Sequence, residues 1–332
     1  MKELLRSVIS KALVFSGTTA LGRTLGSHDG AVIVYGHRVS DDDEGYMQGL
    51  PPHWLDEQLA YLCRHYEIIS LETLVSCLES NQRVPNKSIV LTFDDGFRDN
   101  YENAFPIFEK YKVPATIFLV TGSIDTGQLP WSQRLGYLFQ HTESSELHHE
   151  LLEEGLPLST SEDRRRAYLA IKPRVRVMGF EQREKVINDL SRYLDVQPPT
   201  DRMMTWKQAR ELQAAGIEMG AHTVSHPLLA EIGSDEARDE MEQSRNALQR
   251  KLGIERPKFC FPAGSWSQPL VQIARDLGFR SLFVPSRQRV INQVGRVDPY
   301  SMGRMGLPNS PAVFLEAELD GPLHRIRGLY RH

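Results

Sequence analysis

The sequence is poor in cysteine and contains no long apolar run. Its 332 residues include three cysteines, Cys63, Cys77 and Cys260, which are scattered and odd in number. Such a set indicates reduced thiols in a reducing compartment rather than a disulfide framework. No run of apolar residues approaches the length of a membrane span. The composition, 40% hydrophobic and 25% charged, is that of an ordinary soluble protein with one large domain or two smaller ones.

An excess of charge of one sign is also absent, because the formal net charge is only −4. This balance gives no general attraction to nucleic acid or to an anionic membrane. The stretch MKELLRSVISKALVFSG is a poor signal peptide, since Glu3 and Lys11 interrupt it. Its apolar residues fall on one helical face, so we expect residues 1–30 to form an amphipathic helix packed on the domain. The alternative is a peripheral membrane anchor, and the expected location is cytoplasmic in either case.

Apolar strands alternate with helical segments along most of the chain. The predicted strands are 31–37, 88–93, 115–120, 217–222, 258–264 and 280–285. Helical patterns separate them, as in parallel βαβ units. This organisation indicates an α/β fold built on parallel strands. The last segment, from Asp298 onward, has only a weak pattern.

The region from about 130 to 200 interrupts this alternation. It is helical in pattern and poor in strands, and between Ser161 and Arg192 it has nine Lys and Arg against five Asp and Glu. We interpret it as an insertion between barrel units with a solvated helical face. A lid, or a surface for an acidic partner, is the alternative interpretation.

Polar and ionisable residues recur where the predicted strands end. They are His37, the pair Asp94–Asp95, His222, and the Pro-Ala-Gly turn after Phe261. In parallel α/β folds, active sites form at the carboxyl edge of the strands. We therefore expect these residues to surround one site.

The motif HTVSHP places His222 and His226 four residues apart. On a helical turn this spacing puts both imidazoles on one face, which is a common arrangement for two metal ligands. Most isolated pairs of this kind are incidental histidines. With a strand-end aspartate as third ligand, the set becomes one typical of catalytic zinc, with a position left open for water.

Asp94 and Asp95 are too close in sequence to act as a glycosidase pair, whose carboxyls flank the bond from separate elements. Neighbours on an extended chain point to different sides. One carboxylate can therefore bind a metal while the other faces the reacting water. The alternative interpretation is a simple turn in which Gly96 takes a positive φ.

These signals converge on a known family. The stretch VLTFDDGFRDNYENAFPIFEKYKVPATIFLV, followed by MGAHTVSHP, resembles the NodB-homology polysaccharide deacetylases, carbohydrate esterase family 4. TFDDG and HTxxH are that family's two most specific motifs. The resemblance covers about residues 31–307 apart from the insertion. It implies a distorted (β/α)7 barrel over residues 31–310 with a helical insertion at about 130–200, and a C-terminal tail at 311–332.

The resemblance also implies residue roles. Asp95, His222 and His226 would bind a divalent metal, usually zinc, and Asp94 would be the general base. The metal lowers the pKa of bound water and polarises the acetamide carbonyl, and a general acid protonates the leaving amine. The implied activity removes an N-acetyl group from an amino sugar in a polysaccharide, oligosaccharide or lipid-linked glycan.

Other motifs depart from the family pattern. Many members carry RxPY after the next strand, where this chain has CFPA at 260–263, closer to the FxYPxG form of the exopolysaccharide-deacetylase branch. The N–H of Ala263 is expected to serve the oxyanion, since a backbone donor does not depend on the side chain. Arg304 is the candidate countercharge for Asp94, with Asp298 as its partner, and Arg98 is a weaker option. An ordinary ion pair is the alternative for each of the last three.

The C-terminal LxLxH motif, which usually supplies the acid histidine, is not found. Branches of the family with a YH motif on the first strand supply it from the N-terminal side, and VIVYGHRV resembles that motif. His37 is therefore the expected general acid, and His324 is the fallback. Among the tryptophans, Trp266 is the best candidate to touch a sugar ring. Trp131 is a second, and Trp206 is better explained by core packing.

Two other functions stay open. One is an amidohydrolase of the same fold that acts on a non-sugar C–N bond, although such relatives tend to lack an intact set of two Asp and two His. The other is a catalytically impaired carbohydrate-binding barrel, which would be expected to have lost Asp94. The expected partner in the main interpretation is a glycan or glycolipid carrying an N-acetyl amino sugar, and no nucleic acid.

Overall fold

The computed structural model describes residues 2–25, 30–286 and 290–321, and within them seven parallel strands close into a barrel. In ring order they are β1 (Ala31–Gly36), β12 (Met302–Gly306), β11 (Leu282–Ser286), β10 (Phe259–Cys260), β9 (Glu218–Ala221), β6 (Thr116–Leu119) and β5 (Ser88–Phe93). Pairing of β1 with β5 closes the ring, and β4 (Glu67–Ile68) adds a short strand outside β5. The predicted distorted (β/α)7 barrel is confirmed.

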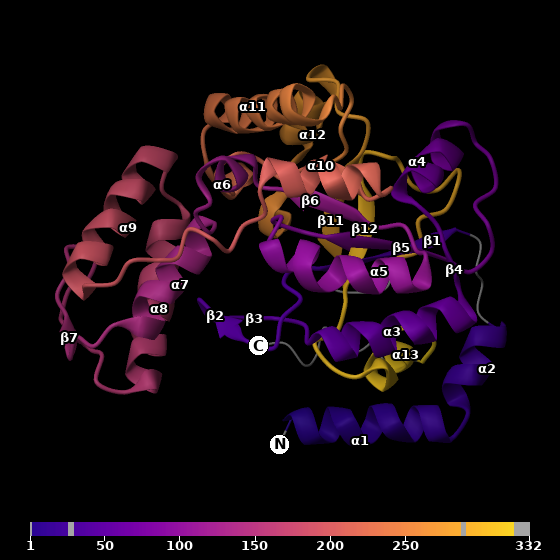
Figure 1. Cartoon of the computed structure of the whole chain (residues 1–332), viewed down its shortest axis with the longest axis horizontal. Coiled ribbons are helices and arrows are strands. Elements are labelled where there is room, and N and C mark those ends of the chain that lie inside the picture. The colour runs from indigo at the N-terminus through magenta and orange to yellow at the C-terminus, as the bar shows by residue number, and fades with distance from the viewer. Residues whose placement is uncertain (1, 26–29, 287–289, 322–332) are drawn as a thin grey trace.

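Helices surround this barrel (Figure 1). They are α3 (Pro52–His65), α4 (Leu71–Glu79), α5 (Phe105–Tyr111), α6 (Thr121–Thr126), α10 (Trp206–Ala214), α11 (Ser234–Leu252), α12 (Gln268–Asp276) and α13 (Ala312–Leu319). Thr205 caps α10 through a reciprocal capping box with Gln208. At the start of α11, Gly233 takes the capping position without a side-chain bond.

Strand β5 shows why the site lies where it does. All six of its residues are buried, which the apolar run SIVLTF requires because the strand sits inside a ring of helices. Its register with β1 is continuous, from Ala31 opposite Ser88 to Gly36 opposite Phe93. The residues that follow the two strands, His37 and Asp94, therefore emerge at the same end of the barrel.

Two segments differ from their sequence patterns. The helical segment that follows β5 begins with a π-helical turn over Asn100–Ala104 before α5. The weakly patterned C-terminal segment contains both β12 and α13. Strand β12 reads MGRMG, and its two glycines hide the alternation that marks a strand. His324 lies outside the described residues.

The N-terminal segment forms α1 (Lys2–Phe15) and α2 (Thr18–Leu25), and α1 packs against α13 (Figure 1). Arg23 of α2 binds Glu316 and Asp320, so buried charges tie the helix to the barrel. Phe15 remains 84% exposed. Within the described ranges, no helix has the length and apolar content needed to cross a membrane.

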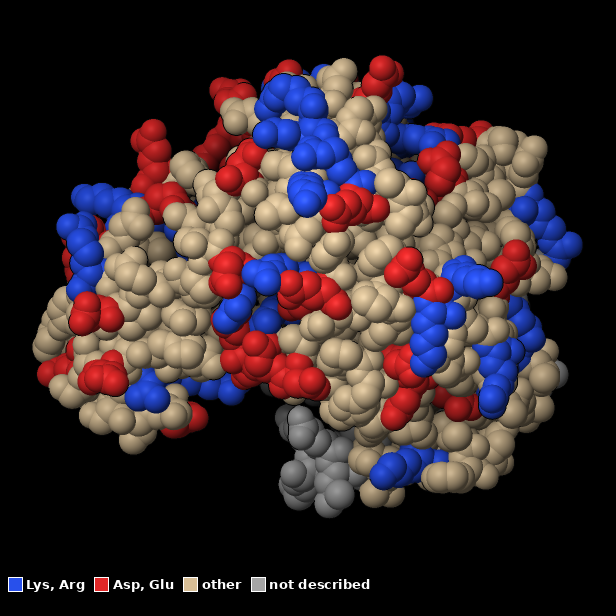
Figure 2. All heavy atoms as spheres, viewed as in Figure 1, with Lys and Arg blue, Asp and Glu red and all other residues tan. Residues whose placement is uncertain are grey.

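The insertion is a helical unit beside the barrel (Figure 1). A hairpin from outside the insertion, β2 (Asp43–Glu44) with β3 (Met47–Gln48), lies near it. The insertion itself consists of α7 (Trp131–His141), α8 (Ser161–Arg176) and α9 (Phe180–Leu194), with the small hairpin β7 (Glu146–Leu147) and β8 (Leu156–Pro157). Its buried apolar side chains form a core of their own. Charges of both signs are interspersed on the face seen in Figure 2, so the basic composition does not make one basic patch there.

Candidate active site

Three predicted metal ligands meet at the carboxyl end of the barrel. Nε2 of His226 lies 3.3 Å, and Nε2 of His222 3.5 Å, from the same Asp95 oxygen, Oδ1. The side chains of Asp95 and His222 are at most 2% exposed, and that of His226 is 14% exposed. One ligand atom from each residue lies within 4.8 Å of the other two. Strand β5 supplies the aspartate and the end of β9 the histidines, as the positions of the motifs predict.

The two histidines do not lie on a helical turn, as the four-residue spacing suggested. The segment 222–226, here called the ligand loop, is irregular, with positive φ angles at Thr223 (68°) and His226 (58°). The loop folds back on itself and places the two rings 5.0 Å apart with their planes at 65°. A strained turn, rather than helical periodicity, therefore brings the imidazoles of His222 and His226 together.

The DDG turn also differs from the expected extended chain. Asp95 has a φ of 75° and Gly96 a φ of 81°. The chain thus reverses at Asp95, and the turn separates the carboxylates of Asp94 and Asp95. A Cβ on Gly96 would come within 2.8 Å of Leu119, so both the conformation and the packing favour glycine there.

The protonation states of the ligand set suit a cation. Nδ1 of His222 lies 2.7 Å from the carbonyl oxygen of Cys260; a carbonyl only accepts, so Nδ1 carries the proton and Nε2 presents a lone pair toward Asp95. Burial lowers the pKa of His222 to about 4 and that of His226 well below its usual value. Both imidazoles are therefore neutral near pH 7.

Asp95 is the third member of the ligand set. Its Oδ1 is buried and has no hydrogen-bond partner among the described residues. Burial, and then the charge of Asp94, raise its pKa well above the usual value. An ionised Asp95 is therefore disfavoured in this buried cluster with His222 and His226. Such a buried cluster is costly unless a cation binds it, and the donor set of one carboxylate and two imidazoles fits zinc.

Asp94 lies beside this set and is oriented by Arg304. Nη1 of Arg304 donates to Oδ1 of Asp94 at 2.8 Å and Nη2 to Oδ2 at 2.7 Å. Both side chains are at most 4% exposed. Burial alone would raise the pKa of Asp94, but the guanidinium outweighs it and holds that pKa well below its usual range. Asp94 is therefore a fixed, ionised carboxylate beside the ligand set.

The other proposed countercharges lie elsewhere. Arg98 binds Glu102 at 2.6 Å with 41% of its side chain exposed. Asp298, expected beside Arg304, instead binds Arg275 at 2.5 Å. Of the described candidates, Arg304 is thus the one in contact with Asp94.

Cys260 is a neighbour of Asp94 that sequence analysis missed. Its sulfur lies 2.7 Å from Nη2 of Arg304 and 4.0 Å from Oδ2 of Asp94. Burial raises the pKa of this thiol well above its usual value, so the thiol stays protonated at neutral pH. Its position in the CFPA segment, where many relatives carry an arginine, was the signal that could have pointed to it.

The predicted general acid, His37, follows β1 at the same end of the barrel. The side-chain amide of Asn100 donates to its main-chain carbonyl at 2.7 Å and fixes the backbone. Burial lowers the pKa of His37, while the charge of Asp94 opposes this effect. His37 is therefore neutral near pH 7, and it lies close enough to Asp94 for that charge to affect its pKa.

Ala263 and the tryptophans have separate environments. Ala263 follows β10 in a left-handed turn with a φ of 48°, and its N–H makes no hydrogen bond to any described residue.

Trp266 is 42% exposed, as a sugar platform requires. Trp131, also considered for that role, is only 4% exposed and its indole donates to the carbonyl of His226 at 2.9 Å. Trp206 is 8% exposed and its Nε1 donates to Asp125.

With this geometry in place, comparison with known proteins identifies the family. Residues 81–282 match the family model described as polysaccharide deacetylase. The chain belongs to the polysaccharide deacetylase family. The resemblance inferred from TFDDG and HTxxH is therefore confirmed.

Solved structures and curated relatives agree with this assignment. The fold matches Streptococcus pyogenes deacetylase PplD (TM-score 0.59, 19% identity, 87% of this chain and 98% of that chain) and IcaB from Ammonifex degensii (0.59, 18%, 89% and 98%). A poly-beta-1,6-N-acetyl-D-glucosamine N-deacetylase of Escherichia coli K12 is 32% identical over 102 residues, 30% of this chain. The chain covers only 15% of the length of that relative. It covers 30% of the length of the polysaccharide deacetylase YxkH of Bacillus subtilis, to which it is 31% identical over 83 residues.

Proposed function

We propose that this polysaccharide deacetylase family member is a metal-dependent enzyme that hydrolyses the N-acetyl group of an amino sugar in a polysaccharide, oligosaccharide or lipid-linked glycan. The observation that carries the proposal is the buried set Asp95, His222 and His226 beside an Asp94 that Arg304 keeps ionised. The activity of the Escherichia coli relative, a poly-beta-1,6-N-acetyl-D-glucosamine N-deacetylase, favours polymers of N-acetylglucosamine as the substrate class.

Asp95, His222 and His226 would hold the divalent metal, and zinc suits their donor atoms best. When bound there, such an ion would lower the pKa of a nearby water and polarise the acetamide carbonyl. The protein holds both imidazoles neutral in advance, because burial lowers their pKa, whereas burial raises the pKa of Asp95. Asp95 is therefore the group that would have to lose a proton when the ion binds.

Asp94 is the proposed general base. Each of its oxygens accepts one hydrogen bond from Arg304, and a carboxylate oxygen has a second lone pair. That lone pair can take the proton of the attacking water while the ion pair keeps the carboxylate in one orientation. A base with a depressed pKa is weak, so its role depends on a water that has itself been made acidic.

His37 and Ala263 supply the other proposed functions. Negative charge that develops on the substrate carbonyl would raise the pKa of the buried His37, which could then carry the proton that the leaving amine needs. The N–H of Ala263, at the turn after β10, is an available donor for the oxyanion. Trp266 offers an exposed ring for the face of a sugar.

The experiment that tests this function measures acetate released by the purified protein from N-acetylglucosamine oligomers and lipid-linked sugars, with and without a chelator. Release that disappears with the chelator and returns with zinc is expected. Release that is unaffected by metal removal would contradict the metal dependence. Absence of release from every N-acetylated sugar, with zinc bound, would instead favour an amidohydrolase with another substrate.

A cytoplasmic location, with α1 at a membrane surface, is a further part of the proposal. The exposed apolar side chains Val8 and Phe15 on this helix support it. Cell fractionation at low and high salt would test it. Protein found only in the soluble fraction at low salt would exclude membrane association.

A further inference from the structure

The ligand loop, residues 222–226, accepts main-chain hydrogen bonds from Thr121 and Gly122 of α6, and side-chain hydrogen bonds hold it from two further sides. One side is the barrel helix α11, and the other is the helical insertion. The loop needs such support because Thr223 and His226 adopt left-handed backbone conformations, which are strained for residues other than glycine. Contacts that fix the loop therefore also fix the position of a metal ligand.

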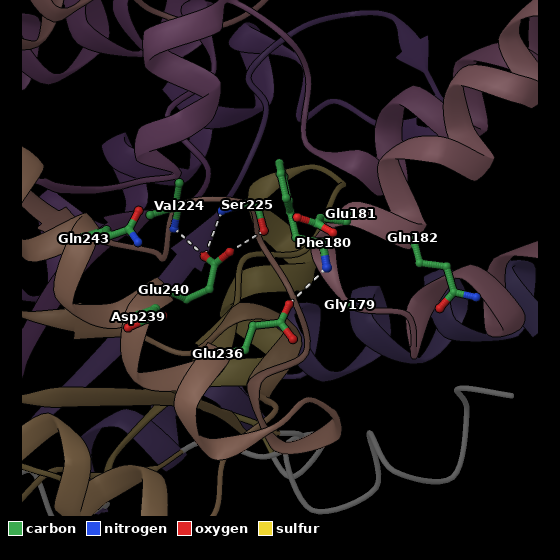
Figure 3. Close-up of a pocket in the computed structure, with 10 residues that line it drawn as sticks. All are labelled: Gly179, Phe180, Glu181, Gln182, Val224, Ser225, Glu236, Asp239, Glu240 and Gln243. Atoms are coloured by element: carbon green, nitrogen blue, oxygen red, sulfur yellow. Dashed lines mark hydrogen bonds between the residues drawn. The ribbon is translucent and has the colours of Figure 1, made fainter.

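On the barrel side, Glu240 of α11 accepts three hydrogen bonds from the loop (Figure 3). Its Oε2 accepts from the N–H groups of Val224 and Ser225 at 2.8 and 2.9 Å, and its Oε1 accepts from the Ser225 hydroxyl at 2.5 Å. Beside these groups lies a cavity of about 680 Å³, lined by Val224, Ser225, α11 and the first turn of α9. Hydrogen bonds, rather than close packing, thus restrain this side of the loop.

On the insertion side, two buried side chains reach the loop. Nε1 of Trp131, in α7, donates to the carbonyl oxygen of His226 at 2.9 Å. Nη2 of Arg183, in α9, donates to the hydroxyl of Ser225 at 2.9 Å. Arg183 is 0% exposed, and its guanidinium lies 5.5 Å from the centre of the Trp131 ring. The two residues form one unit that contacts the loop at consecutive positions.

We propose that Trp131 and Arg183 are positioning residues that hold His226 in place to bind the metal, so that the insertion is part of the metal centre. This inference rests on the proposed metal dependence. The physical reason is that the main chain of His226 sets where its imidazole can reach, and Trp131 donates directly to that main chain. Residues that orient metal ligands in this way typically contribute 10- to 100-fold in metal affinity.

The test compares zinc affinity, measured by competition with a chromophoric chelator, in the full-length wild-type protein and in Trp131→Phe. This substitution removes the indole N–H and keeps an aromatic ring in the core. About a 10-fold loss of zinc affinity is expected. Trp206→Phe is the matched control, because Trp206 is similarly buried and donates its Nε1 to Asp125. It should leave zinc affinity within about 2-fold of wild type.

Arg183→Met provides a second variant that keeps the volume of the side chain and removes the donor to Ser225. Two readouts separate positioning from general stabilisation. The visible absorption of bound cobalt should change in both variants, because the coordination geometry changes. The rise in melting temperature on adding zinc should shrink, because that rise reflects metal affinity. A purely structural role would lower the melting temperature equally with and without zinc.

The outcomes distinguish this inference from the proposed function. If the wild-type protein binds neither zinc nor cobalt, the proposed metal dependence fails. If wild type binds zinc and both variants bind it equally well, with unchanged cobalt spectra, the proposed function survives and the positioning role is refuted. Weaker binding in both variants with an unchanged Trp206→Phe control supports the role of the insertion.

Discussion

Replacing Arg304 with methionine tests the central electrostatic contact of the site. In the wild-type protein its guanidinium donates to both oxygens of Asp94, to the hydroxyl of Thr92 at 3.0 Å and to the sulfur of Cys260. Arg304→Met keeps much of the apolar volume but leaves Asp94 buried without its countercharge. Breaking a buried ion pair in this way costs about 3–5 kcal/mol. We expect a loss of this size in the free energy of unfolding at pH 7, measured by urea denaturation of the metal-free protein.

The loss should also depend on pH. In wild type the pKa of Asp94 is depressed, so its contribution to stability is present above the unfolded pKa of about 3.9 and is lost as the pH falls through the folded pKa. Without Arg304, burial raises that pKa above the unfolded value. The variant then regains stability as the pH falls and Asp94 becomes protonated, and the difference from wild type should shrink.

Two further variants complete the design. Arg304→Met combined with Asp94→Asn should recover much of the lost stability, because no buried charge is left unpaired. Arg98→Met is the matched control, since its ion pair with Glu102 is 41% exposed on the arginine side and should contribute no more than about 1 kcal/mol. A loss in Arg304→Met no larger than in this control, and the same at pH 7 and pH 5, would refute the buried ion pair.

The remaining predictions concern turnover. Asp94→Asn should bind zinc with wild-type affinity yet lose at least about 100-fold in acetate release, and substantial activity in this variant would refute the base assignment. His37→Ala should lower kcat by about 100-fold with the metal site still filled, as measured by zinc content; unchanged turnover would move the acid role to another group. Trp266→Ala should raise KM for oligosaccharides several-fold with little change in kcat, because stacking on a sugar contributes about 1 kcal/mol. An unchanged KM would exclude contact between Trp266 and the sugar.

Local sequence patterns were enough to place the ends of most strands. SIVLTF is β5 residue for residue, and the ends of β5 and β9 bring Asp95 and His222 together. Such residues are predictable because a parallel strand carries its own signal, and its carboxyl end faces the site by topology. The loop between the histidines was not predictable from the same signal. Its left-handed residues, Thr223 and His226, have no local sequence mark.

Contacts between segments far apart in the chain were the main features that the sequence could not predict. Trp131 was a candidate for sugar binding as one of the tryptophans, yet it is buried and bonded to His226, 95 positions away. Arg183 likewise belongs to a region interpreted as a solvated helical face, and it is fully buried. Only the tertiary fold shows that α7 and α9 meet the ligand loop, because the periodicity of a helix does not indicate which segment its buried face contacts.

The charge around Asp94 shows how closure of the barrel and chemistry are linked in this chain. Where many relatives carry an arginine after the next strand, β10 ends in Cys260, whose small side chain leaves room for a guanidinium that arrives from β12. Arg304 pairs in register with Ile33 of β1 and with Pro285 of β11, so it lies in the strand that joins β1 to β11. The strand with the weakest sequence pattern thus supplies the countercharge for the proposed base. Proline at Gly303, whose N–H donates to Asn292, should detach β12 from its neighbours. It should therefore weaken the pairing of Arg304 with Asp94, even though it contacts no residue of the metal-ligand set.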